Sequence, residues 1–123
     1  MRKLLLLFVL SSQITRAEKL PLLDQLISLN KNWQGKSLPA ALKDSVSEQL
    51  DDVTLIRLHL KLVEEALQKG TAVGLSKQQI EKRMSSISAL RAYRERGVFP
   101  KNYHFNHRQP VFIDEHGTYC AVG

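Results

Sequence analysis

The sequence predicts a mainly α protein: a small bundle of three to four helices, followed by a C-terminal arm with a short β-hairpin. Three observations lead to this fold class. The chain has 123 residues, 43% of them hydrophobic, which suits one domain with a modest core and excludes a disordered or collagen-like chain. Leucine-rich segments recur at helical spacing up to Gly97. Beyond Gly97, aromatic residues and histidines replace that pattern.

The first seventeen residues have the features of a secretory signal peptide. Arg2 and Lys3 precede an unbroken apolar run over residues 4–10, and Ala17 places a small residue before the expected cleavage site. The apolar run is much shorter than the about 20 residues that a membrane-spanning helix needs. We therefore expect an exported protein, periplasmic or extracellular, whose mature chain begins at Glu18 and contains no membrane span.

Removal of this segment changes the charge balance. The whole chain has 18 basic and 12 acidic residues, and three of the basic ones, Arg2, Lys3 and Arg16, lie in the first seventeen positions. The mature chain therefore carries 15 basic and 12 acidic residues, a net charge of +3 rather than +6. So small an excess, in an exported chain, argues against a nucleic-acid partner.

The helical domain, residues 18–97, begins with a helix behind Pro21, a residue type that suits a first helical turn. Its apolar positions repeat at helical spacing and are Leu20, Leu22, Leu23, Leu26, Ile27 and Leu29. Asn30 and Gly35 favour a turn after this helix. We expect Trp33 to fold back from the turn onto the core.

A second helix is expected after Ser37 and Pro39. Its apolar residues, one turn apart, are Leu42, Val46 and Leu50. Asp51 and Asp52 follow, and the sequence leaves two alternatives for them. They either cap a new helix or lie on the exposed face of one long helix.

The segment from Val53 to Lys69 predicts the central helix. Two apolar stripes run along it and bound an arc of about 200° at about 100° per residue. They consist of Val53, Ile56, Leu60, Val63 and Leu67, and of Leu55, Leu58, Leu62 and Ala66. Such a helix needs neighbours on more than one side. His59 lies within the apolar arc, where a hydrogen-bonded core or edge residue is the simpler interpretation and a pH sensor is the alternative.

The last helix has the clearest boundaries in the sequence. Ser76 and Gln79 form a capping box at its start, and Gly97 supplies a left-handed stop. A narrower apolar stripe follows the capping box and consists of Ile80, Met84, Ile87, Leu90 and Tyr93. Arginines gather near the C-terminal end, where cations complement the helix dipole.

Residues 98–123 form the C-terminal arm, which we expect to pack on the helical domain. The patterns over 111–114 and 118–122 predict the two strands of a hairpin, with Gly117 at a turn position that needs a positive φ. The sequence stops on apolar residues inside the second strand. We therefore expect the hairpin to be incomplete and the reading frame to continue past Gly123.

The arm also carries a motif of fairly specific spacing. It reads G-x-F-P-x-N from Gly97 and R-x-P-x-F-I-D-x-x-G-x-x-C-A-V-G from Arg108. This motif resembles a segment of uncharacterised exported bacterial proteins, and it implies no known activity. In those proteins it typically runs on past C-A-V-G into further apolar residues, which implies that any disulfide partner of Cys120 lies outside this sequence.

Histidines and one cysteine in the arm suggest two kinds of chemistry. His104, His107, His116 and Cys120 supply imidazole and thiolate ligands of the kind that zinc prefers. Asp114, His116 and Cys120 alternatively supply an orienting carboxylate, a base and a thiol nucleophile. The simpler interpretation is exposed loop histidines near a buried or disulfide-bonded cysteine. We therefore expect no cofactor, and a metal- or thiol-dependent enzyme with zinc is the alternative.

The function class that we expect is a noncatalytic binding or structural module. Phe99, Tyr103, Phe105 and Arg108 are residue types favoured at interface hot spots, although the same residues can close the helical core as a lid. From Lys77 to Arg108 the chain has eight basic and two acidic residues. That excess suits an acidic protein, a phosphorylated envelope polymer or an anionic lipid surface as partner.

Overall fold

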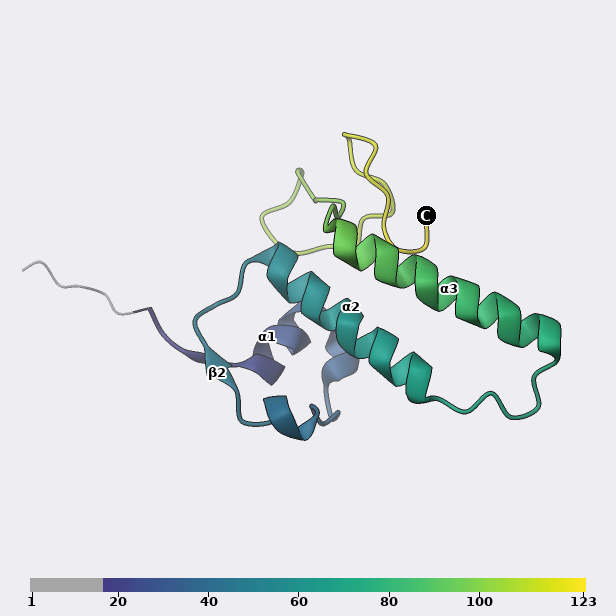
Figure 1. Ribbon diagram of the computed structural model, residues 1–123. Helices are drawn as coiled ribbons and strands as arrows, with labels where there is room; N and C mark the ends of the chain where they lie inside the picture. The colour runs from purple at the N-terminus through teal and green to yellow at the C-terminus, as the bar shows by residue number, and fades with distance from the viewer. Residues whose placement is uncertain (1–16) are drawn as a thin grey trace, which may run out of the picture.

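A computed structural model describes residues 17–123 (Figure 1). The predicted signal peptide, residues 1–17, lies outside these residues except for Ala17. Three α-helices make up the framework and are α1 (Leu22–Leu29), α2 (Asp52–Lys69) and α3 (Lys77–Arg96). The predicted fold class is confirmed: the protein is mainly α, with a small antiparallel sheet and a short hairpin in the arm.

Helix α2 is central and contacts both α1 and α3. Figure 1 shows α2 and α3 side by side as an antiparallel pair, with α1 on the other side of α2. The core consists of Leu22, Leu26, Leu38, Leu55 and Leu62. Leu60 and Glu64 are buried on α2 as well. The wide apolar arc of the central helix therefore has neighbours on two sides, as the sequence predicts.

The second predicted helix is wrong. Only a 3-10 helix, η2 (Ala40–Leu42), forms after Pro39, and Val46–Ser47 is a strand, β2, that pairs antiparallel with β1 (Leu20–Pro21). The segment Asp-Ser-Val-Ser has low helix propensity, because its polar side chains compete for backbone groups and valine is β-branched. A further 3-10 helix, η1 (Lys31–Trp33), forms the predicted turn.

Gln25 holds this extended segment against α1. Its side chain is buried, and its Nε2 donates to the Ser47 hydroxyl at 3.1 Å. Its Oε1 accepts the backbone N–H of Leu50 at 2.9 Å. A buried amide stabilises the fold only when its donors and acceptors are paired, and here both ends are. The hydrogen bonds of Gln25 thus hold an extended segment where the apolar spacing predicts a helix.

Glu64 joins α2 to α3. Its carboxylate is buried, with Oε1 2.6 Å from Arg91 Nε and Oε2 3.1 Å from Arg94 Nη2. The hydrogen bond from Arg91 is the main cause that lowers the pKa of Glu64; burial opposes it, and Arg94 adds to the lowering. A carboxylate at this position is tolerated because two guanidinium groups pair with it.

The helix ends follow the sequence signals. The Asp51 carboxylate caps α2 by accepting from Thr54, whose hydroxyl and backbone N–H both lower the pKa of Asp51. This settles the alternatives for Asp51 in favour of a new helix. The capping box of Ser76 and Gln79 begins α3, and Gly97 ends it with φ of 67°.

The arm starts from the end of α3 and returns to it. Phe99 is buried and packs edge to face on Tyr93, with ring centroids 5.3 Å apart. The Tyr93 hydroxyl donates to the Tyr119 carbonyl at 3.1 Å. The hairpin is short, with a single antiparallel bridge between Ile113 and Tyr119 and a turn in which Gly117 has φ of 77°. Within residues 17–123, none of the helices is long and apolar enough to cross a membrane.

Candidate binding groove

A broad open groove separates the arm from the helical domain. Its volume is about 1980 Å³, and its walls come from α1, η1, the first half of α2 and residues 97–112 of the arm. The apolar side chains on these walls include Ile27, Leu29, Val53, Ile56, Phe99, Phe105, Val111 and Phe112. Cavities for small molecules usually measure about 300–1,000 Å³ and enclose most of the ligand. A groove of this size and openness instead suits a segment of a larger molecule.

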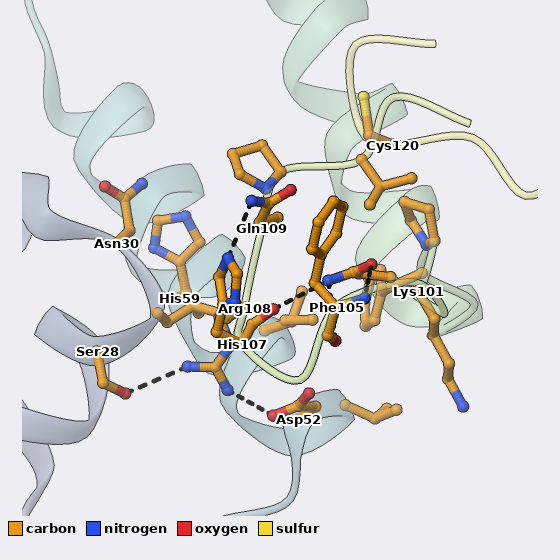
Figure 2. A pocket seen from close by; sticks show the side chains of 18 of the residues that line it. Ser28, Asn30, Asp52, His59, Lys101, Phe105, His107, Arg108, Gln109 and Cys120 are labelled. Atoms are coloured by element: carbon orange, nitrogen blue, oxygen red, sulfur yellow. Dashed lines mark hydrogen bonds and ion pairs between the residues drawn. The ribbon is translucent and has the colours of Figure 1, made fainter. Parts of the chain in front are cut away.

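Arg108 fixes the arm across one end of this groove. Its Nη2 lies 2.5 Å from the Asp52 Oδ1 at the start of α2, and its Nη1 donates to the Ser28 hydroxyl of α1 at 3.2 Å. Figure 2 shows the Arg108 side chain reaching from the arm toward both helices. One guanidinium therefore ties together three segments that are far apart in the sequence.

Asp114 holds the other part of the arm in shape. Its carboxylate accepts the backbone N–H groups of Thr118 at 2.9 Å, His116 at 3.0 Å and Lys101 at 3.1 Å. Burial acts to raise the pKa of Asp114, but these three hydrogen bonds outweigh it, so the pKa is lowered. The carboxylate thus links the hairpin turn to the beginning of the arm.

His59 and Trp33 form a polar contact at the groove wall. The indole Nε1–H of Trp33 donates to the Nδ1 of His59 at 2.9 Å, and the two rings meet edge to face. The Nδ1 atom accepts only when it carries no proton, so the imidazole in this contact is neutral. Partial burial lowers the pKa of His59, which favours the same neutral form. Trp33 folds back onto the core as predicted, and His59 is a hydrogen-bonded edge residue.

The four predicted binding residues have different environments. Phe105 is 56% exposed and lines the groove, whereas Phe99 is only 7% exposed and closes the end of the helical core. Arg108 lines the groove and is held by its ion pair with Asp52. Tyr103 lies outside the groove lining, is 49% exposed and packs on the His116 ring.

The predicted metal ligands and thiol site are not brought together. His104 lies 4.0 Å from Glu115, His107 contacts Gln109 at 3.0 Å, and His116 packs on Tyr103. In the described part of the chain, no three His, Cys, Asp or Glu side chains are grouped so that they could hold a metal ion. The zinc hypothesis therefore gains no support from the geometry.

Cys120 is half-buried and unbonded, at the edge of the groove (Figure 2). Its charge influences the Tyr93 hydroxyl. Burial raises the pKa of Tyr93, and Cys120 adds to that rise. Within residues 17–123, Asp114, His116 and Cys120 are not grouped as a thiol nucleophile, base and orienting carboxylate would be.

Several groove residues were missed by the sequence analysis. Ser28 and Asn30 at the end of α1, and Asp52 at the start of α2, line the groove together with His59. The sequence did offer a signal for Asp52. Only one of two adjacent acidic residues is needed to cap the helix, so the other can pair with a distant cation. The sequence offered no such signal for Ser28 and Asn30, because their place in the groove depends on how the distant arm folds. Ser28, for example, contacts Arg108, 80 positions later.

No protein-family model, curated protein or solved structure matches the chain. The groove must therefore be interpreted from its own chemistry. Its charged lining residues are Lys31, Lys101, Arg108 and Asp52, and Arg108 already neutralises Asp52. What remains is an apolar surface with an excess of positive charge, which can bind apolar side chains and an acidic group.

Proposed function

We propose that this protein is a noncatalytic binding module that takes an extended, partly apolar and acidic segment of a partner protein into the groove. The observation that carries the proposal is an open, aromatic-lined groove whose one carboxylate is occupied by Arg108. Extended peptides bind in grooves through alternating side chains, and aromatic residues supply most of the contact energy. Phe105 and Phe112 are exposed aromatic residues of the lining, and Phe105 serves as the anchor.

The fixed position of the arm supports this function. A groove that exists before the partner arrives spares the cost of ordering its walls on binding. Arg108 and Asp114 supply this order, since each connects two or more segments of the chain. The arm is therefore anchored on α3 through Phe99 and forms one wall of the site.

Export is part of the same proposal. Residues 1–17 have a basic start, a short apolar run and Ala17 at the expected cleavage site, which supports delivery to the periplasm or the exterior of a bacterial cell. The N-terminal sequence of the exported protein tests this. A protein that begins at Glu18 agrees with cleavage, and one that retains Arg2 and Lys3 contradicts it.

Selection of random peptides displayed on phage tests the binding function. We expect the enriched peptides to share apolar residues and at least one acidic residue. Phe105→Ala should lower the affinity for a selected peptide tenfold or more, which corresponds to a loss of about 1.4 kcal/mol in binding free energy. Tyr103→Ala is the matched control, because Tyr103 is an equally exposed arm aromatic outside the groove. Selected peptides that bind the Phe105→Ala variant as well as the unchanged protein would contradict the proposal.

A further inference from the structure

The far end of the α2–α3 pair exposes a group of large apolar side chains. We call residues 67–84 the hairpin tip; they comprise the last turn of α2, the connection and the first two turns of α3. Val73 is 87% exposed and Met84 is 56% exposed. The other exposed apolar residues of the tip are Leu67, Leu75 and Ile80. The stripe that the sequence predicts for α3 is thus buried at Ile87 but open at its beginning.

The arrangement of the helices explains this exposure. In Figure 1 the connection between α2 and α3 lies at the end of the pair that points away from α1 and from the arm. The high exposure of Val73 and Met84 agrees with this position of the connection. A cluster of exposed apolar residues on a protein surface usually marks a contact site.

The tip is nevertheless a well-formed element. Arg83 Nη2 donates to the Leu67 carbonyl at 2.5 Å and closes the connection across the two helices. The Gly70 N–H donates to the Ala66 carbonyl at 3.0 Å, and the capping box of Ser76 satisfies the start of α3. Because these backbone groups are paired within the tip, its apolar side chains can enter an apolar medium at lower cost.

The same segment carries an excess of positive charge. Four basic side chains lie in the tip, Lys69, Lys77, Lys82 and Arg83, against the single acidic Glu81. The tip therefore has a net charge of +3. Lysine side chains can extend their charged ends toward phosphate groups while their stems lie along an apolar surface.

We propose that the hairpin tip binds the surface of an anionic phospholipid membrane, with Val73 entering the interface and the lysines contacting the headgroups. Exposed apolar residues that share a segment with an excess of basic ones are a feature of peripheral membrane-binding elements. A narrow projecting end suits a lipid surface better than a protein, which would have to provide a matching cavity. The tip is at the opposite end of the α2–α3 pair from the groove, so both can be occupied together (Figure 1).

A fluorescent probe at the tip tests the proposal in the full chain. Val73→Cys, in a Cys120→Ser background, gives a single thiol for an environment-sensitive dye. Val46→Cys in the same background is the matched control, because Val46 is an exposed valine on β2. With vesicles of equal parts phosphatidylglycerol and phosphatidylcholine, the Val73 probe should shift its emission to shorter wavelength, and the Val46 probe should not. The probe reports its own surroundings, so any membrane contact of residues 1–17 does not produce this difference.

The charge requirement is tested with the same probe. Lys69→Gln with Lys77→Gln should raise the lipid concentration needed for the response about thirtyfold, because each lysine near an anionic surface contributes about fivefold. High salt should also reduce it. A Val73 probe that stays silent with anionic vesicles overturns the proposal. An equal response to vesicles of pure phosphatidylcholine also overturns it. The same holds if an acidic protein shifts the emission of the probe and vesicles do not.

Discussion

A few polar side chains determine how the segments of this protein meet. Gln25 holds the chain after η2, Glu64 joins α2 to α3, and Asp114 and Arg108 place the arm. Each satisfies groups that would otherwise be unpaired, which is why the apolar core itself can be small. Sequence periodicity does not predict such contacts, because polar residues have no pattern that identifies their partners.

The contact between Trp33 and His59 predicts a pH-dependent fluorescence change. Protonation of His59 removes the acceptor on Nδ1, so the indole N–H is released and emission should shift to longer wavelength. Since the pKa of His59 is lowered, the stabilising contact is fully present above the ordinary histidine pKa of about 6.5 and is lost as the pH falls further, through the lowered pKa of His59.

Trp33 is the only tryptophan, so its emission between pH 8 and pH 4.5 measures this directly. In His59→Asn the amide oxygen can occupy the position of Nδ1 and accept the hydrogen bond, and it does not titrate, so the shift should vanish. A shift of the same size in that variant would assign it to one of the other histidines.

At the scale of helices and turns, the sequence predicted most of what is observed. The three α-helices, the Ser76 capping box and the Gly97 stop follow from local signals that act within one or two turns. The strands β1 and β2 were missed because two residues are too short to show an alternating pattern. They form because Gln25 and the Leu22 N–H donate hydrogen bonds to Ser47 and Ser45, in the segment that returns to the start of α1.

The ion pairs of Glu64 predict how acid affects the contact between α2 and α3. Because the pKa of Glu64 is lowered in the folded protein, its contribution is present above the ordinary glutamate pKa of about 4.3 and is lost as the pH falls below it. Glu64→Gln should lower the free energy of unfolding at pH 7 and reduce its change between pH 5 and pH 3. Urea unfolding measures both.

Glu65→Gln is the matched control for this prediction. Glu65 is half-exposed and lies 3.9 Å from Lys61, so its replacement should change the stability little. Equal losses of unfolding free energy in the two variants would contradict a special contribution of the buried Glu64 carboxylate to stability.

Gly97 predicts a steric effect at the end of α3. Its φ of 67° disfavours any side chain, and a Cβ there would also overlap the Arg57 guanidinium, which donates to the Glu95 carbonyl at 3.0 Å. Gly97→Ala should lower the free energy of unfolding by about 1–2 kcal/mol from the backbone alone, and further through the lost Arg57 contact. Gly74→Ala shares the positive φ but meets open space, so it should cost less. The reverse order in thermal unfolding would contradict this account.

At the scale of the whole molecule, the groove depends on contacts that no local pattern contains. Arg108 and Asp52 are 56 positions apart, and Arg108 and Ser28 are 80 apart. The sequence indicated the arm and its aromatic residues but not which of them would be buried. Phe99 is buried and Phe105 exposed, although both are phenylalanines in the same segment.

Arg108→Ala should free the arm without unfolding the helices. Its ion pair is partly exposed, so the expected loss of global stability is below about 1 kcal/mol. Amide hydrogen exchange should become faster over residues 103–110 and stay unchanged in α2. Lys101→Ala removes an arm cation that has no ion pair within residues 17–123, and it should leave exchange unaltered. Unchanged exchange in Arg108→Ala would mean that the arm is held by other contacts.

The central claim is that a partner segment binds in the groove between the arm and the helices. Nuclear magnetic resonance of the isotope-labelled protein, titrated with a peptide selected on it, tests this claim most directly. We predict that the largest chemical-shift changes occur over residues 27–31, 53–59 and 105–112, on the two walls of the groove. Changes that are confined to α3, or that are spread evenly over the chain, would contradict it.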